Sequence, residues 1–131
     1  MRIRNCEFVA LVSVLGLSLS CTDTMTVCTT SAVTVTASSS THPTFRWSPN
    51  CVAGEVLVEE ARTPSSGGNH TVWLIAALSA GNGTDSPVLY GYVPPRMGQT
   101  QTPEPLVSGH AYIVSVLNVT GQMIGQTVFG P

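Results

Sequence analysis

Short runs of apolar residues, separated by turn residues, fill most of the chain beyond residue 30. In the run 44–47, Phe45 and Trp47 fall on one side of an extended chain and Arg46 on the other. No stretch combines a helical period with capping residues, and Gly, Pro, Asn and Ser separate the runs. The pattern predicts an all-β domain of roughly seven strands, built as two packed antiparallel sheets. The predicted strands cover residues 32–37, 44–47, 55–61, 70–78, 88–93, 112–116 and 123–129.

Two of these regions depart from simple alternation. The run 70–78 is apolar on both faces, as in a strand that is covered from two sides. The segment 94–105 contains four prolines and several Gln and Thr residues. It is either a long connection that carries a binding surface or a short edge strand at about 99–102.

The N-terminal segment has the composition of an export signal. Arg2 and Arg4 precede an apolar run at 8–19, and the small residue Ser20 follows. A run of about a dozen residues is too short to cross a hydrocarbon core, which needs roughly twenty in a helix. We therefore expect residues 1–20 to form a signal helix that is cleaved.

Cys21 directly follows this segment, and its position resembles the lipobox of bacterial lipoproteins. The resemblance implies a diacylated thiol at Cys21 and an exported, membrane-anchored protein of the cell envelope. Because Thr22 rather than Asp follows the cysteine, it implies the outer membrane in a host with two membranes. Ser18 and Ser20 also satisfy the small-x-small rule of ordinary signal peptidase, so plain secretion without lipid is the alternative.

Cys28 and Cys51 are the only pair left once Cys6 is removed with the signal and Cys21 carries lipid. In an oxidising compartment we expect them to form one disulfide. Two free thiols in a reducing compartment are the alternative. A metal site is disfavoured, because zinc modules place their cysteine ligands close together in sequence.

The exported part divides into a linker at 21–30, rich in Thr and Ser and lipid-anchored under this interpretation, and a single domain at 31–131. We expect the Thr- and Ser-rich stretch to act as a flexible leash. The chain contains no lysine, and beyond residue 20 it has three arginines against six carboxylates. Such a balance cannot neutralise a phosphate backbone, which excludes nucleic acid as a partner.

Two motifs resemble fibronectin type III domains. The segment Phe45-Arg46-Trp47-Ser48-Pro49 is similar to that family's second strand. Its L-x-x-G-x-x-Y-x-V-x-V run is matched by Leu106, Gly109, Tyr112, Val114 and Val116. The resemblance implies a single seven-stranded antiparallel β-sandwich of fibronectin type III type. In it Trp47, Leu106 and Tyr112 belong to the structural core, and the Tyr112 hydroxyl bonds to backbone a few residues upstream.

Candidate chemistry is sparse. The chain has three histidines, His42, His70 and His110. None has a local nucleophile motif beside it, and we expect all three to be exposed in loops. The acidic residues Glu55, Glu59 and Glu60 are expected to form a solvated strand edge, since adjacent Glu59 and Glu60 point to opposite faces. We predict no catalytic residue, no metal and no cofactor, and hence not an enzyme.

The leading interpretation is a membrane-anchored lipoprotein with a non-catalytic structural or binding module for an unknown protein or carbohydrate ligand. A soluble secreted adhesion or receptor-type domain is one alternative. Under it, the sequons at Asn69, Asn82 and Asn118 would carry N-linked glycans; under the leading interpretation they are only polar turns. A carbohydrate-binding accessory domain of a hydrolase is the other, with stacking rings from Trp73, Tyr90 and Tyr92.

Overall fold

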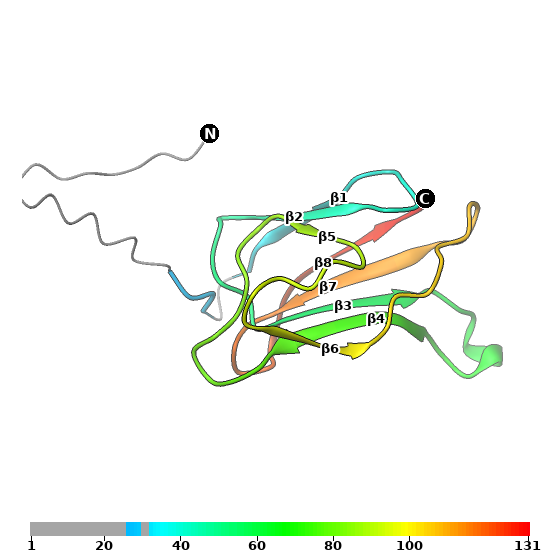
Figure 1. The fold of residues 1–131 in the computed structure, drawn as a ribbon. Coiled ribbons are helices and arrows are strands. Elements are labelled where there is room, and N and C mark those ends of the chain that lie inside the picture. Colours follow the sequence, from blue (N-terminus) through cyan, green and yellow to red (C-terminus); the bar gives the residue numbers. More distant parts are fainter. Residues whose placement is uncertain (1–25, 30–31) are drawn as a thin grey trace, which may run out of the picture.

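The computed structural model describes residues 26–29 and 32–131. This part of the chain forms eight β-strands and one short 3-10 helix, so the predicted all-β class is confirmed (Figure 1). In chain order the elements are β1 (Thr34–Ala37), β2 (Thr44–Ser48), β3 (Glu55–Glu60), η1 (Pro64–Ser66), β4 (His70–Ala77), β5 (Val88–Leu89), β6 (Met97–Gln101), β7 (Tyr112–Leu117) and β8 (Met123–Phe129).

The strands form two antiparallel sheets. One has three strands in the order β1-β2-β5, and the other has five in the order β6-β4-β3-β7-β8. Figure 1 shows the small sheet as a separate layer above the large one. The layers are joined at one side, where the backbone N–H of Val33 donates to the carbonyl of Ile124 at 2.9 Å.

The core lies between the two sheets and follows from alternation along the strands. In β3, Val56 and Val58 are fully buried, and across the sheet they pair with equally buried residues of β4 and β7. An aromatic cluster connects the layers. The ring of Phe45 in β2 lies 6.5 Å from that of Trp73 in β4 and 5.4 Å from that of Phe129 in β8. Each such edge-on or tilted ring contact stabilises the core in addition to the burial of the apolar ring surface.

The described part of the chain has one strand more than the seven that were predicted. This additional strand, β6, lies within the proline-rich segment 94–105, so the short edge strand is the correct one of the two alternatives for that segment. It covers Met97–Gln101 and pairs with β4 alone. The predicted strand 88–93 is shorter than expected, because β5 ends at Leu89 and the chain turns. The Tyr92 N–H donates to the Leu89 carbonyl at 3.1 Å, and Gly91 takes a φ of 81°, which favours glycine.

The predicted disulfide between Cys28 and Cys51 is present. Beside it, the Cys28 N–H donates to the Val52 carbonyl, and the Val52 N–H donates to the Thr26 carbonyl. Residues 26–29 of the predicted linker therefore pack on the domain. The predicted signal peptide at 1–20 and the predicted lipidation site Cys21 lie outside the described residues.

Trp47, Leu106 and Tyr112 are all buried. The indole N–H of Trp47 donates to the Cys51 carbonyl at 2.9 Å, which connects the core to the disulfide. The Tyr112 hydroxyl accepts a hydrogen bond from the Val107 N–H at 2.9 Å, so it fixes the chain that enters β7. This is the geometry of a tyrosine corner.

Candidate functional site

A groove of about 640 Å³ opens where three segments of the chain meet. These segments are the entry to β2, the turn after β5 and the connection from β6 to β7. Most of the side chains around the groove are apolar or aromatic. Its lining consists of Thr41, His42, Leu89, Tyr90, Gly91, Tyr92, Pro103, Glu104, Pro105 and Leu106.

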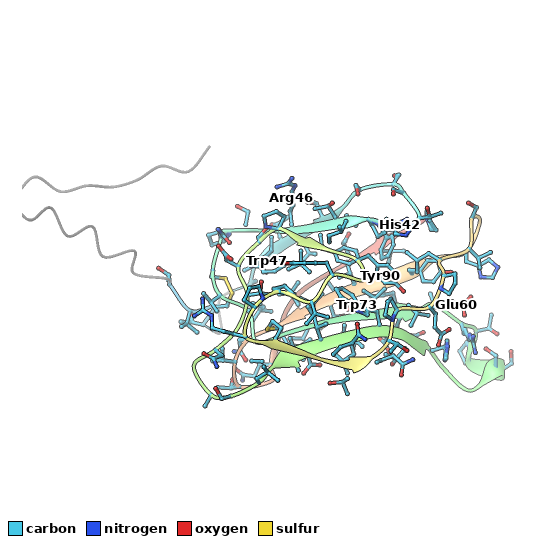
Figure 2. The ribbon with its side chains drawn as sticks, viewed as in Figure 1. His42, Arg46, Trp47, Glu60, Trp73 and Tyr90 are labelled. Atoms are coloured by element: carbon cyan, nitrogen blue, oxygen red, sulfur yellow. A yellow bond between two sulfur atoms is a disulfide. The ribbon has the colours of Figure 1, made fainter. Side chains whose placement is uncertain are left out.

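Tyr90 forms part of the buried base of this groove. Its hydroxyl donates to the Glu104 carbonyl at 2.7 Å, with the Val72 carbonyl at 3.3 Å, and its ring lies 5.2 Å from that of Trp73. Figure 2 shows Tyr90 and Trp73 pointing inward between the sheets. Burial, and then the charge of Glu104, raise the pKa of Tyr90 to about 12. Tyr90 therefore stays a neutral hydrogen-bond donor that holds the β6–β7 connection on the core.

Two of the three rings considered for carbohydrate stacking, those of Trp73 and Tyr90, are out of a ligand's reach. Trp73 is fully buried and Tyr90 is 5% exposed, because both rings fill the space between the sheets. Tyr92 is 55% exposed and is the one ring of the three that a ligand could reach. The buried indole N–H of Trp73 has no hydrogen-bond partner in the described part of the chain.

His70 and Glu104 are in hydrogen-bond contact beside the groove. Nε2 of His70 lies 3.0 Å from both carboxylate oxygens of Glu104. His70 is the first residue of β4, where the predicted strand 70–78 begins, and it is partly buried rather than exposed in a loop. Sequence reasoning did not single out Glu104, although it is the one acidic residue of the proline-rich segment. His42 is exposed, with Nδ1 3.4 Å from the Thr41 hydroxyl.

A second group of charged residues lies at the same end of the sheet. Figure 2 shows Glu60 there, and its carboxylate binds Nη2 of Arg62 at 2.7 Å and Nδ1 of His110 at 2.5 Å. The contact joins the end of β3 to the loop before β7. The prediction that these glutamates protect a strand edge is wrong, because β3 lies in the middle of the five-stranded sheet.

The Glu60 cluster predicts a pH dependence of stability. Hydrogen bonds from His110 and Arg62 hold the pKa of Glu60 below its usual value of 4.5. A lowered pKa in the folded state stabilises the protein above pH 4.5, and the contribution is lost as pH falls through the folded pKa. We expect Glu60→Gln to lose less stability on acidification than the wild-type protein, because it lacks the carboxylate that His110 and Arg62 stabilise. The measurement is the free energy of unfolding between about pH 3 and 7, a range that includes the titration of carboxyl groups.

Glu59→Gln is the matched control, because the Glu59 carboxylate makes no ion pair with any described residue. The interpretation fails if Glu60→Gln and the wild-type protein lose stability in parallel on acidification.

The three sequon asparagines lie in the connections between strands, and the first sequon continues into β4 with His70 and Thr71. The Asn118 side chain is buried and organises the β7–β8 turn, since its Oδ1 accepts from the N–H groups of Thr120 and Gln122 and its Nδ2 donates to Gln122 Oε1. A glycan on Nδ2 is incompatible with this arrangement. Asn82 donates to the Ser79 hydroxyl, and the side-chain oxygen of Asn69 accepts from the Arg62 N–H.

Among residues 26–29 and 32–131, no group of three or more His, Cys, Asp or Glu side chains is arranged to hold a metal ion. The same residues contain no helix with the length and apolar character needed to cross a membrane. Comparison of the chain with protein-family models, with curated proteins and with solved structures finds no match.

Proposed function

We propose that this protein is an exported lipoprotein, anchored to a membrane through Cys21, whose β-sandwich is a non-catalytic structural or binding module. The observation that carries the proposal is the Cys28–Cys51 disulfide. Disulfides persist in oxidising compartments outside the cytosol. The bond therefore supports the export that the N-terminal sequence predicts.

The type of sandwich belongs to the same proposal. We infer a fibronectin type III-like domain from two pieces of support. Trp47 is buried in the β2 strand, and Tyr112 makes its corner bond to Val107. In this assignment β6 is an additional edge strand, which extends the larger sheet beyond β4.

The non-catalytic part of the proposal rests on how the histidines are engaged. His70 bonds Glu104 and His110 bonds Glu60, and each pair ties together segments distant in sequence. A nucleophilic mechanism also requires a third group that orients the base, and His42, whose Nδ1 lies 3.4 Å from the hydroxyl of the adjacent Thr41, is not hydrogen-bonded to a carboxylate of any described residue. The ligand contact of the module would be the groove beside Tyr92.

Mass spectrometry of the mature N-terminus tests this function. We expect the wild-type protein, produced in a bacterial host and recovered from the membrane fraction, to begin at Cys21 and to carry a diacylglycerol mass on that residue. Cys21→Ser should lose both the added mass and the membrane association, because a hydroxyl does not accept the lipid.

Cys28→Ser is the control, since it removes a different cysteine and should leave the lipid in place. A wild-type product that retains residues 1–20, or that starts at an unmodified residue and is free of membranes, would contradict the anchor.

A further inference from the structure

The outer face of the five-stranded sheet, which points away from the small sheet, carries several aliphatic side chains. In β3, Val56 and Val58 face the core, so Leu57 between them faces outward. The same alternation directs aliphatic residues outward from β4, β7 and β8. We call this surface the outer face, and its aliphatic members are Leu57, Leu74, Ile113, Leu117, Met123 and Val128.

The strand register places these side chains opposite one another on neighbouring strands. Leu57 lies opposite Leu74, Ile113 lies opposite Val128, and Leu117 lies opposite Met123. Val128 is 67% exposed and Met123 is 57% exposed, at the β8 margin of the face. Polar residues lie between the aliphatic ones: Ser115 and Gln126 continue the row of Leu57, and Glu55 and Glu59 flank Leu57 on β3, so aliphatic and polar side chains alternate across the four strands. An antiparallel sheet normally keeps one face polar toward water.

The small sheet provides the contrast within the same molecule. Its outward positions on β1 and β2 are polar, with Thr36 opposite Arg46 and Thr34 opposite Ser48, and β5 adds one outward aliphatic residue, Leu89. Figure 2 shows Arg46 pointing away from the domain. The outer face of the five-stranded sheet therefore carries more aliphatic side chains than the outward side of the small sheet.

Two carboxylates are set among the aliphatic side chains. Glu55 lies opposite Leu117, and Glu59 lies opposite Ile113. Neither makes an ion pair with any of the described residues. Burial raises the pKa of Glu55, which means that its charge is already partly removed from water without a compensating cation.

We propose that the outer face is a docking surface for a different protein, one that presents aliphatic side chains together with Lys or Arg. Charge complementarity selects this occupant, because a cation opposite Glu55 and Glu59 would neutralise carboxylates that the chain leaves unpaired. A second copy related by two-fold symmetry would bring the carboxylates of both copies to one interface. An anionic membrane surface would repel them.

A short β-hairpin peptide with leucines and lysines on one side serves as the probe, with its leucine–glutamate analogue as the charge control. We expect the lysine hairpin to shift the backbone amide resonances of β3, β4, β7 and β8. Leu57→Ser should weaken its binding at least about tenfold, as for a central interface residue. Glu55→Gln/Glu59→Gln should weaken it several-fold and reduce its salt dependence.

Arg46→Ser, on the outward side of the small sheet, is the matched variant that should bind the lysine hairpin like the wild type. A thermal unfolding curve for each variant establishes that it is folded. The proposal is overturned if neither hairpin binds, if the glutamate hairpin binds equally well, or if the shifted amides lie on β1, β2 and β5. Sedimentation that shows a dimer disrupted by Leu57→Ser would assign the face to a second copy instead.

Discussion

Replacement of Phe45 by alanine is expected to lower the free energy of unfolding by about 3–5 kcal/mol, the usual cost of truncating a buried aromatic ring. Phe45 is fully buried in β2, and its ring contacts those of Trp73, Tyr90 and Phe129. These partners come from the opposite sheet and from the turn that forms the groove. The substitution therefore removes the group at which the two layers meet.

Chemical denaturation of the variant, followed by tryptophan fluorescence, measures this loss. Tyr92→Ala is the matched control, since it removes an aromatic ring that is 55% exposed and should change stability by less than about 0.5 kcal/mol. Similar losses for the two variants would show that the Phe45 cluster does not hold the sheets together.

The double substitution Cys28→Ser/Cys51→Ser is expected to cost about 3 kcal/mol, because it frees a loop closed by residues 23 positions apart. The covalent bond restricts the unfolded chain, and its loss lets residues 26–29 separate from Val52. The free energy of unfolding should fall by the same amount when the wild-type protein is reduced with excess thiol.

Reduction of the double variant is the control and should change nothing further. If the oxidised wild type and the double variant unfold at the same denaturant concentration, the disulfide contributes nothing to stability.

The sequence pattern predicted the class of fold well, because core strands such as β3 and β7 bury valines at every second residue. Strand ends were also close for β4 and β8, whose boundaries coincide with a histidine after a Gly/Asn turn and with a phenylalanine before the final glycine. The disulfide followed from cysteine counting. In each case the prediction needed only the residues of the segment itself or a count of the cysteines.

The site could not be predicted in the same way, since it depends on contacts between segments far apart in sequence. Trp73 and Tyr90 are aromatic in a stretch that suits a sugar platform, yet tertiary packing buries both rings. Glu104 became notable only when the fold placed it against His70, which lies 34 residues earlier. The sequence indicated the aliphatic outer face only in the run 70–78, which is apolar on both faces.

The Cys28–Cys51 disulfide, near the start of the domain, has a mechanical consequence. Tension applied from the N-terminal side reaches the sandwich at Cys28 and passes through the two sulfur atoms to Cys51. The intervening stretch, which contains β1 and β2, cannot lengthen while the bond is intact. A molecule pulled from this side would thus keep β1 and β2 shielded and yield first among the strands outside the closed ring, which include β5 of the same sheet.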